Sequence, residues 1–254
     1  MSDTLVIVPT YNNAGTLEDV LRRCLAQGLP VLVVDDGSTE STPQILEKMP
    51  GQVKTKSPDF VMADSDRPSL SVITHQFNKG KGNALKTGFY EARKQGYKYA
   101  LTIDSDGQHF PEDIPALLAA KGERTLVVGS RSQMGANGGG SFANSFSNFW
   151  FRLYTGVNLP DTQTGFRLYP LQELPSLKLL SARYEAELTL LVFSAWKGLK
   201  MKPVPVRVAY PEDRVSHFRP GADFMRITLL NTLLLLVALF YGWPRTIVRH
   251  ICGK

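Results

Sequence analysis

The sequence predicts an α/β fold, a mostly parallel sheet with helices on both faces, from two observations. Short apolar runs rich in β-branched residues alternate along the chain with segments of helical periodicity. Polar turn residues close most of these runs, as expected where parallel strands connect to crossover helices. Ligands of such doubly wound sheets bind at the carboxyl ends of the strands, so the polar residues there are the first candidates for a site.

The first half of the chain supplies most of the predicted elements. Apolar runs predict strands at residues 5–8, 31–34, 70–74, 99–103 and 125–128. Periodicity and capping residues predict helices at residues 16–27, after the Ser/Thr-rich stretch near residue 40, at 82–96 and at 114–120. The segment 51–69, rich in Pro, Asp and Lys, interrupts this order and is expected to be a long loop.

The second half changes in composition but is expected to complete the same domain. A glycine-rich stretch leads into an aromatic segment, and a helix around residues 184–198 precedes a strand-like run at 202–210. No clear linker separates these segments from the sheet. We therefore expect one domain over residues 1–222, followed by an apolar helix and a basic tail over 223–254.

Composition and charge narrow the class of protein. With 254 residues, 43% of them hydrophobic, the chain is long enough for a substantial core. Its formal charge of +6 favours an anionic partner: a nucleotide diphosphate, a phospholipid surface or a nucleic acid. Nucleic acid is the least favoured, because no zinc spacing or basic reading helix is present. Two cysteines at opposite ends, and an N-terminus that does not read as a signal peptide, predict a cytoplasmic location.

Asp104 and Asp106 directly follow the run at residues 99–103 and are the strongest candidates for a site. Two carboxylates this close repel each other unless a positive group lies between them, and a divalent cation with oxygen ligands meets that need. Gln108 adds a neutral oxygen, and His109 is a nearby hydrogen-bonding group. The alternative is a polar turn in which an aspartate caps the following helix.

A second polar turn follows the run at residues 31–34. Asp36 can accept a hydrogen bond from a ribose or a base edge, and Gly37 allows close backbone approach. Pro9 and Tyr11 end the first predicted strand and place an aromatic face beside this turn. Lys81 stands where a glycine-rich stretch opens a helix, which suits an anion. The alternatives are an ordinary turn and a solvated lysine.

These motifs resemble the successive signatures of the family 2 glycosyltransferases, which have the GT-A fold. The nearest branch includes dolichyl-phosphate mannose synthase and other polyprenyl-phosphate glycosyltransferases. The likeness extends from about residue 4 to residue 220. Seven stretches carry it in the same order: VIVPTYNNAGTLEDVL, VVDDGSTEST, NKGKGNALKTGF, DSDGQHFPEDIP, VGSR, DTQTGFRLYP and YEAELTLL.

The resemblance implies roles for individual residues. A nucleotide-sugar donor, GDP- or UDP-linked, would be held at its nucleoside by Pro9, Tyr11 and Asp36. The D-x-D element would be Asp104 and Asp106, and a Mg²⁺ or Mn²⁺ ion would lie at Asp104, Asp106 and Gln108. Arg131 and Arg167 would face the diphosphate or an acceptor phosphate, because a guanidinium matches phosphate oxygens. The alternative is that either arginine pairs with a nearby aspartate.

The chain departs from the family pattern in two places. Segment 51–69 is longer than the usual connection. Where many relatives have Arg-x-x-Ser-Lys, this chain has Arg214, Val215, Ser216 and His217. Histidine titrates near neutrality and lysine does not, which weakens the case for a phosphate contact at Arg214 and His217, although Arg219 can compensate.

The resemblance also implies direct displacement with inversion at the anomeric carbon. The cation and the arginines would stabilise charge that develops on the leaving diphosphate. A lipid phosphate acceptor is already anionic and needs only positioning, whereas a hydroxyl acceptor needs a carboxylate to take its proton. Glu185 and Glu187 are the candidates for that base, with Asp161 a third. The two glutamates, at i and i+2 on a helix, point in different directions.

Residues 227–244 form an uncharged stretch of eighteen residues, the lower limit for crossing a bilayer. Arg226 precedes it and Arg245 follows it, so flanking charge gives no orientation. Small and polar residues gather near one helical face, opposite a leucine-rich face, which predicts a helix in the membrane interface with Tyr241 and Trp243 near the headgroups. The alternatives are a terminal helix packed on the domain and a homodimer contact.

The predicted function is therefore that of a metal-dependent, inverting glycosyltransferase. It would act at the cytoplasmic face of the inner or cytoplasmic membrane, peripherally associated or anchored, and move a sugar from a nucleotide donor to a lipid-linked acceptor such as a polyprenyl phosphate. Two other functions fit the same residues. One is a catalytically silent, nucleotide-sugar-binding membrane scaffold, and the other is a sugar nucleotidyltransferase, which would release pyrophosphate.

Overall fold

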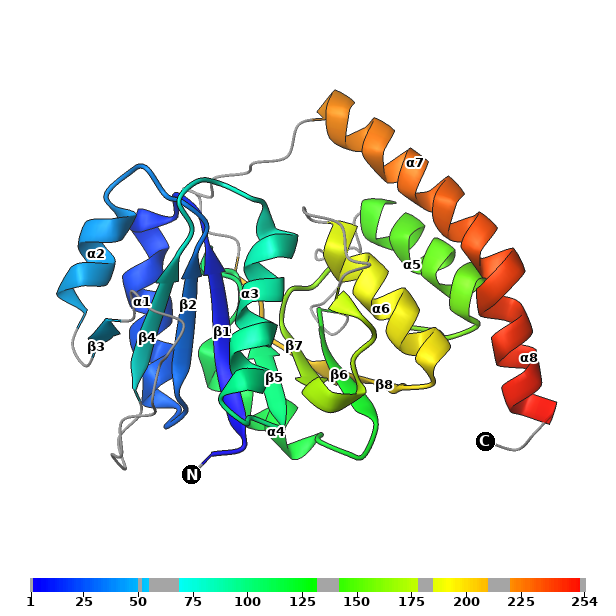
Figure 1. The fold of residues 1–254 in the computed structure, drawn as a ribbon, viewed down its shortest axis with the longest axis horizontal. Helices are drawn as coiled ribbons and strands as arrows, with labels where there is room; N and C mark the ends of the chain where they lie inside the picture. The colour runs from blue at the N-terminus through cyan, green and yellow to red at the C-terminus, as the bar shows by residue number, and fades with distance from the viewer. Residues whose placement is uncertain are drawn as a thin grey trace.

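An eight-stranded sheet forms the centre of the molecule (Figure 1). The structure, a computed structural model, describes residues 2–49, 52–54, 69–131, 142–177, 185–209 and 220–251. Within them the strand order is β3-β4-β2-β1-β5-β7-β6-β8. The strands are β1 (Thr4–Thr10), β2 (Val31–Asp35), β3 (Gln52–Lys54), β4 (Leu70–Thr74), β5 (Tyr99–Thr102), β6 (Thr125–Ser130), β7 (Arg167–Pro170) and β8 (Lys200–Pro205).

The sheet is mostly parallel, as predicted, with one reversed strand. β7 runs antiparallel to both β5 and β6, whereas β1, β2, β3, β4 and β5 pair in parallel, as do β6 and β8. The sequence analysis missed β7, because four residues that begin with arginine and end with proline show no strand periodicity. It also placed residues 52–54 in a loop, where the structure has the short strand β3; residues 55–68 of that loop lie outside the described residues.

Helices cover both faces of the sheet. One face carries α1 (Ala14–Ala26), α2 (Thr42–Lys48) and α4 (Ile114–Ala119), and the other carries α3 (Lys81–Lys94), α5 (Phe142–Thr155) and α6 (Glu185–Lys197). β1 shows why the two layers form: Val6 and Val8 pack with the first set of helices, and Leu5 and Ile7 with the second. Alternate side chains of a strand face opposite sides, so a strand covered on both sides reads as a continuous apolar run.

The chain ends in a helical rod that lies along α5 (Figure 1). It consists of α7 (Pro220–Val237), a π-helical turn (Ala238–Gly242) and α8 (Trp243–Ile251). Leu234 and Ala238 belong to the same buried cluster as α3, α5 and α6. The domain boundary expected after residue 222 therefore falls inside α7, and the rod is packed on the domain.

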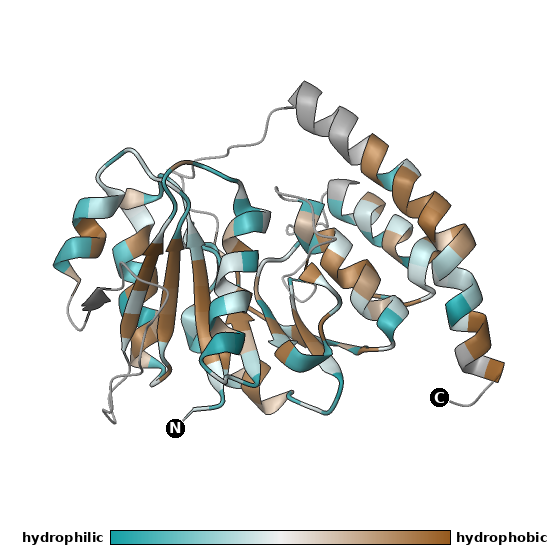
Figure 2. Ribbon diagram, in the orientation of Figure 1, coloured by the Kyte–Doolittle hydropathy of each residue, from teal (hydrophilic) through white to brown (hydrophobic). Residues whose placement is uncertain are grey.

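The rod is apolar on the side that faces away from the domain. Its segment Leu229–Val248 is long and apolar enough, by length and composition, to cross a membrane, with a mean hydropathy of 1.3 and only 22% of it buried. The described part of α7 and the end of α8 are coloured as hydrophobic in Figure 2. Leu229, Leu233, Leu236 and Phe240 are all exposed, with Phe240 the most exposed of them at 82%.

Candidate active site

The turn after β5 carries Asp104 and Asp106 and is fastened to the start of α1. Ser105, which is buried between the two aspartates, accepts a hydrogen bond from Asn13 Nδ2 at 2.8 Å. Its carbonyl accepts from Thr16 Oγ1 at 2.6 Å. The neighbouring carboxylates are therefore held at the end of the strand by uncharged contacts of the residue between them.

The same turn closes over Asp106. Asp106 Oδ1 accepts from the backbone N–H of Gln108 at 3.0 Å. Gly107 between them has φ +72°, the left-handed conformation that a side chain disfavours, and an added Cβ would also contact Thr16. A short polar turn of this kind, and not a regular strand, thus sets the directions of Asp104 and Asp106.

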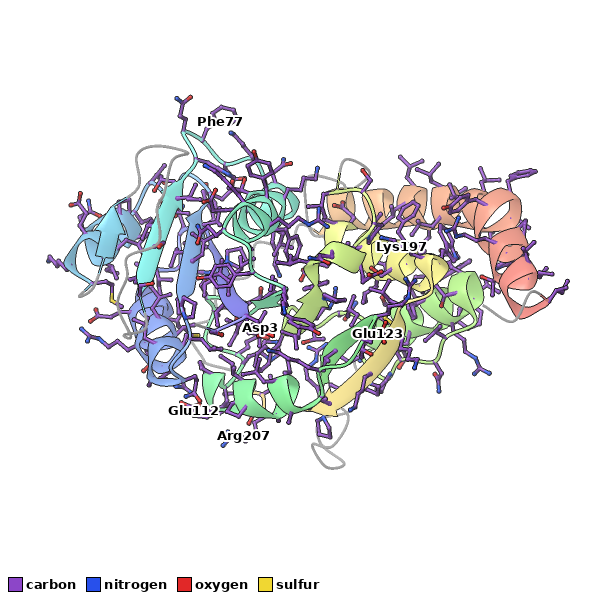
Figure 3. The ribbon with its side chains drawn as sticks, turned by 60° about the horizontal axis from the view of Figure 1, so that its bottom comes forward. Asp3, Phe77, Glu112, Glu123, Lys197 and Arg207 are labelled. Carbon is purple, nitrogen blue, oxygen red and sulfur yellow. The ribbon has the colours of Figure 1, made fainter. Side chains whose placement is uncertain are left out.

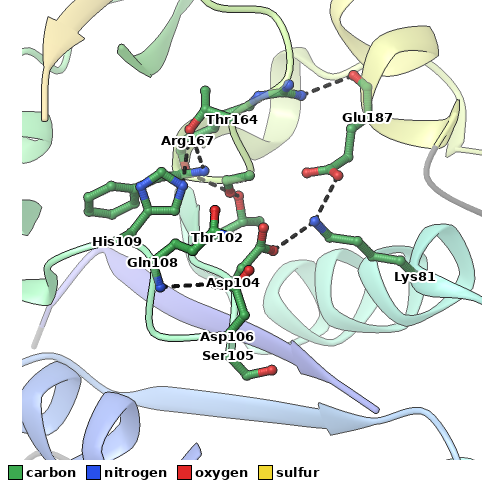
Figure 4. A network of polar contacts seen from close by, with 12 residues as sticks. Lys81, Thr102, Asp104, Ser105, Asp106, Gln108, His109, Thr164, Arg167 and Glu187 are labelled. Carbon is green, nitrogen blue, oxygen red and sulfur yellow. Dashed lines mark hydrogen bonds and ion pairs between the residues drawn. The ribbon is translucent and has the colours of Figure 1, made fainter. Parts of the chain in front are cut away.

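Lys81 joins Asp104 to Glu187 (Figure 4). Its ammonium lies 2.7 Å from Asp104 Oδ1 and 2.8 Å from Glu187 Oε2. The three groups come from the start of α3, the end of β5 and the first turn of α6, which meet at the carboxyl edge of the sheet. Lys81 is 17% exposed, so it is not a solvated surface lysine. The sequence analysis expected a metal ion to compensate the aspartates, and in the structure Lys81 compensates Asp104.

Burial and pairing oppose each other in this cluster. Burial disfavours the charged form of Asp104, but the nearby Lys81 ammonium outweighs it, and the pKa of Asp104 is lowered. Burial likewise disfavours the charged form of Lys81, and the two carboxylates outweigh it, so the pKa of Lys81 is raised. At neutral pH the cluster therefore holds an ammonium between two acidic side chains. Oε1 of Glu187 is buried and has no hydrogen-bond partner.

Gly165 gives the Asp104 carboxylate its space. A Cβ at position 165 would overlap the carboxylate group of Asp104. The backbone there is fixed from the strand side, because Thr102 Oγ1 donates to the Gly165 carbonyl at 2.7 Å. Because Gly165 has no side chain, the DTQTG stretch leaves room for the Asp104 carboxylate. This role was not predicted from the sequence.

Gln108 and His109 are buried beside this cluster. Nε2 of Gln108 and Nδ1 of His109 have no hydrogen-bond partner. The His109 ring lies against Phe166, with ring centroids 5.3 Å apart. Burial lowers the pKa of His109 to about 4, so the ring is neutral near pH 7. His109 is therefore a buried neutral neighbour of the aspartates and not a second cation.

The donor set fits a hard cation that brings its own further ligands. Asp104, Asp106 and Gln108 offer carboxylate and amide oxygens within five residues, which suits Mg²⁺ or Mn²⁺. Within the described ranges, no group of three or more His, Cys, Asp or Glu side chains that could hold a metal is found. An ion held here would therefore keep positions for water and for phosphate oxygens of a substrate.

Asp36, expected to contact a ribose or a base edge, is buried and is contacted by groups of the chain itself. It is 2% exposed, and its carboxylate accepts three hydrogen bonds from the chain itself. His75 Nδ1 lies 2.6 Å from Oδ1, the Lys79 N–H donates to Oδ1 at 3.0 Å, and the Gly80 N–H donates to Oδ2 at 2.7 Å. Asp36 therefore holds the loop between β4 and α3. Little of the Asp36 carboxylate therefore remains for the nucleoside contact that the resemblance implies.

The unpaired carboxylate oxygen at this turn belongs to the preceding residue. Asp35 Oδ1 accepts from the Ser38 N–H at 3.0 Å, while Oδ2 is buried without a partner. Pro9 is buried in β1 opposite Val34, and Tyr11 is half-buried just after that strand. Pro9 and Tyr11 thus lie at the same edge of the sheet as the turn that carries Asp35 and Asp36, as expected from the sequence.

Arg131 and Asp161 form a closed ion pair. Arg131 Nε donates to Asp161 Oδ2 at 2.6 Å and Nη2 to Oδ1 at 2.9 Å, and backbone N–H groups of Arg131 and Gln163 donate to the same carboxylate. Burial opposes ionisation of Asp161, but these donors outweigh it and lower its pKa. A carboxylate held in its charged form is a weak proton acceptor, which weighs against Asp161, the third candidate for the base. The contact with Asp161 fits the alternative interpretation of Arg131, pairing with an aspartate.

Arg167, expected to face a phosphate, is held by contacts within the chain. It is fully buried in β7, where its guanidinium donates to the carbonyls of Thr162 and Glu187 at 2.9 and 3.0 Å and to the Tyr169 hydroxyl at 3.2 Å. The sequence analysis placed it at a phosphate because arginine suits that task, but a strand of four buried residues draws it inward. Its contact with the Glu187 carbonyl makes it a support for the start of α6.

Of the two glutamates, the structure brings Glu187 to the cluster. Glu187 is 7% exposed, and Glu185, two residues earlier on α6, is only half-buried. The expectation that the pair points in different directions agrees with this difference in burial. Arg214 and His217, together with Arg219, lie outside the described residues.

His75 is the residue of this edge that the sequence analysis missed. A signal for it was present, because it is the first polar residue after the predicted strand 70–74, the position where Asp36 and Asp104 were found. Its ring is buried and touches both Asp36 and Thr87 of α3. A single histidine after a strand carries no motif, which explains the omission.

Known proteins of similar sequence include two transferases that are named for lipid-phosphate acceptors. UDP-N-acetylglucosamine–dolichyl-phosphate N-acetylglucosaminyltransferase of Methanococcus voltae is 28% identical over 84% of this chain and 88% of its own length. Undecaprenyl-phosphate mannosyltransferase of Micrococcus luteus is 29% identical over 80% of this chain and 82% of its own. Each relative spans most of its length, so the likeness is not confined to one motif.

Solved structures show the same fold. Glucosyl-3-phosphoglycerate synthase of Mycobacterium tuberculosis, crystallised with Mn²⁺, uridine diphosphate and glucosyl-3-phosphoglycerate, superposes with a TM-score of 0.62 over 92% of this chain and 79% of its own, at 19% identity. The profile of the glycosyl transferase family 2 matches residues 5–169, which include both aspartate turns and Lys81. With the predicted GT-A fold and a match over more than half of its length, the chain belongs to glycosyl transferase family 2.

Proposed function

We propose that this protein transfers a sugar from a nucleotide-sugar donor to a polyprenyl phosphate. Relatives that match over at least four fifths of the chain are named for dolichyl-phosphate and undecaprenyl-phosphate acceptors, which supports this acceptor class. The observation that carries the proposal is the cluster of Lys81, Asp104 and Glu187 at the carboxyl edge of the sheet. It places a buried cation and an unpaired carboxylate oxygen beside the Asp106 turn.

The proposed reaction is one displacement. An oxygen of the acceptor phosphate attacks the anomeric carbon, the bond from that carbon to the nucleoside diphosphate breaks, and the diphosphate leaves with the electron pair. A phosphate acceptor is anionic at neutral pH, so no base is needed. The protein supplies position and compensating charge, and Lys81 is the described side chain that we assign to the phosphate oxygens.

A divalent ion belongs to the same proposal. Asp104, Asp106 and Gln108 would hold Mg²⁺ or Mn²⁺, and structural neighbours crystallised with either ion support that assignment. When bound, the ion would stabilise negative charge on the departing diphosphate. Glu187 would hold Lys81 toward the site, and the half-buried Glu185 has no assigned part in a reaction that needs no base.

We also propose that the helical rod binds a membrane surface with its long axis along the surface. The side of the rod that faces the domain contacts α5 and α6 at several positions. The Tyr154 hydroxyl donates to the Asn231 carbonyl at 3.0 Å, Gly242 lies so close to Trp196 that a Cβ would overlap the ring, and Arg245 Nε donates to the Trp196 carbonyl at 3.2 Å. A rod that crossed a bilayer would lose these contacts.

The opposite side of the rod offers an apolar surface to lipid. Exposed Leu233, Leu236 and Phe240 follow the helical repeat, and Ile247 and Ile251 continue it along α8. Exposed Phe149 on α5 is apolar as well. Trp243, expected at the headgroups, is instead half-buried and donates from Nε1 to the Leu153 carbonyl at 3.2 Å, while Tyr241 is 46% exposed.

A transfer assay tests the reaction. The full chain is incubated with Mg²⁺ or Mn²⁺, radiolabelled UDP- or GDP-sugars and polyprenyl phosphate, and the lipid product is extracted. We expect labelled lipid with at least one donor, lost in Asp106→Asn and retained in Asp19→Asn, whose carboxylate is exposed on α1. Donor binding without product from any donor would favour a scaffold. Release of pyrophosphate when the chain is instead given a nucleoside triphosphate and a sugar 1-phosphate would favour a nucleotidyltransferase.

A vesicle experiment tests the membrane surface independently of the reaction. The double variant Leu233→Ser, Phe240→Ser should sediment with lipid vesicles far less than the unaltered chain, because two exposed apolar side chains are lost. The matched control is Phe77→Ser. Phe77 is 63% exposed but lies on the loop before α3, far from the rod (Figure 3). Equal sedimentation of all three proteins would contradict the proposed surface.

A further inference from the structure

We propose that His75 is a positioning residue for sugar transfer, which it serves by holding the Asp36 carboxylate against the start of α3 and thereby fixing the place of Lys81. This inference rests on the proposed function for its catalytic consequence, but the contact itself does not. His75 is 7% exposed and immediately follows β4, and its backbone N–H donates to the Asp35 carbonyl at 2.8 Å. The ring is therefore fixed to the sheet before its side-chain contacts are counted.

The two ring nitrogens of His75 reach two different elements. Nδ1 lies 2.6 Å from Asp36 Oδ1 at the end of β2, and Nε2 lies 2.9 Å from Thr87 Oγ1 on α3. A carboxylate only accepts, so Nδ1 carries the proton in this contact. The threonine hydroxyl can donate to Nε2 or accept from it, so the Thr87 contact is available in either protonation state of the ring. The ring thus connects the sheet to α3.

Asp36 passes this constraint to the start of the helix. Its two oxygens accept the backbone N–H groups of Lys79 and Gly80, at 3.0 and 2.7 Å. Gly80 is the residue before α3 and has φ +91°, so the helix starts from a backbone conformation that Asp36 holds in place. The loop leaves little slack, since a Cβ on Gly37 would overlap the backbone of Phe77.

Lys81 is the first residue of α3, directly after Gly80. The helix is held at Gly80 through Asp36 and at Thr87 through the His75 ring, and these points are separated by about 10 Å along the axis at a rise of about 1.5 Å per residue. Directly after Thr87, Gly88 packs on Ile7 with no room for a Cβ. Two attachment points and one close packing contact fix the height and rotation of the helix, and so the position from which Lys81 reaches Asp104 and Glu187.

Two substitutions separate the two ring nitrogens. In His75→Asn the side-chain amide nitrogen lies near the position of Nδ1 and can still donate to Asp36. In His75→Gln the amide extends to the position of Nε2 and retains Thr87 but not Asp36. If holding Asp36 is the task, His75→Asn should keep kcat within about threefold of the unaltered enzyme. His75→Gln should lower kcat by about ten- to hundredfold, as expected for a displaced charged group, with the donor KM changed less.

Amide exchange supplies a readout that does not depend on turnover. In the full chain, the amides of Lys79 and Gly80 should exchange at least about tenfold faster in His75→Gln than in His75→Asn, measured on peptides spanning residues 76–82. Thr87→Val is the matched control, because it removes the other partner of the ring and should leave both amides protected. Each variant is first checked for an unchanged far-ultraviolet circular dichroism spectrum.

The outcomes distinguish this inference from the proposed function. Equal kcat values and equal exchange in the Asn and Gln variants would overturn the role of His75. Faster exchange with unchanged kcat would overturn the link to catalysis while leaving sugar transfer in place. If the unaltered chain transfers no sugar from any donor, the proposed function fails, and the exchange comparison still decides whether His75 holds Asp36 against the helix.

Discussion

Two buried carboxylate clusters at the edge of the sheet differ in how completely they are satisfied. Asp161 receives donors from Arg131 and from two backbone N–H groups, so its lone pairs are used within the chain. Asp104 and Glu187 share one ammonium, and one oxygen of Glu187 has no partner. A saturated carboxylate stabilises structure, whereas an incompletely paired one retains capacity for a ligand. Asp161 therefore belongs to a structural ion pair, whereas Asp104 and Glu187 belong to a candidate ligand site.

The strongest test of the difference removes the shared cation. Lys81→Met should lower kcat for sugar transfer by about a hundred- to a thousandfold, the range for loss of a group that stabilises developing charge. Steady-state kinetics with the donor found in the transfer assay measures this loss. The control is Lys86→Met, which alters a lysine on the same helix whose ammonium donates to Asn83 Oδ1 at 3.3 Å. Equal losses in both variants would contradict a specific role for Lys81.

The saturated pair should respond in stability instead. Asp161→Asn removes the charge that Arg131 contacts, and we expect the free energy of unfolding to fall by about 2 kcal/mol, since hydrogen bonds to charged groups are lost. Urea unfolding followed by tryptophan fluorescence measures it. The pKa of Asp161 is lowered in the folded chain, so its contribution is present above the ordinary value of 3.8 and lost as pH falls through the folded value. A difference between variant and unaltered chain that grew on acidification would contradict this sign.

A substitution that crowds the cluster of Lys81, Asp104 and Glu187 should lower kcat by less than the loss of Lys81 does. Gly165→Ala places a Cβ where the Asp104 carboxylate lies, so the carboxylate must leave the position in which it contacts Lys81. We expect kcat to fall by about tenfold or more, the cost of a displaced charged group. Gly15→Ala is the matched control, because nothing lies within 4 Å of the Cβ that it adds to α1. Full activity in Gly165→Ala would show that the position of Asp104 is unimportant.

Loss of an exposed ion pair should have the smallest effect of these substitutions. Arg23 and Glu112 join α1 to the turn before α4 at 2.7 Å, with side chains 28% and 41% exposed. The hydrogen bond from Arg23 lowers the pKa of Glu112 to about 2. Glu112→Gln should nevertheless lower stability by less than about 1 kcal/mol, because solvent and salt screen such pairs. Thermal unfolding at low and high salt checks this, and a loss as large as that of Asp161→Asn would remove the distinction.

The sequence predicted the framework of the site better than its contacts. The carboxyl edge was predictable because Asp36 and Asp104 each follow an apolar run, and a parallel sheet brings such positions together. The identity of their partners was not predictable. Glu187 reaches Lys81 across more than a hundred residues of sequence, and nothing in the local pattern of either residue specifies that pair.

Two residues have contacts other than the substrate groups assigned to them. Arg167 was assigned to a phosphate and Asp36 to a ribose because of what their side chains can bind. Both are buried, and groups of the chain itself contact the Asp36 carboxylate and the two Nη atoms of Arg167. Burial depends on how β7 and the loop before α3 close over the site, which is a tertiary property. Side-chain chemistry therefore predicted which chemical groups lie at the carboxyl edge of the sheet. Tertiary packing determined which residues present those groups to a ligand.

The position of Lys81 has a consequence for how the protein is made. A site that depended on a metal ion for charge compensation would leave acidic groups repelling one another in a newly synthesised chain. Here an ammonium carried by a helix of the same chain meets the carboxylates as the helix docks. This edge of the sheet can thus assemble during synthesis without a divalent cation, so the yield of folded protein should not depend on metal supply.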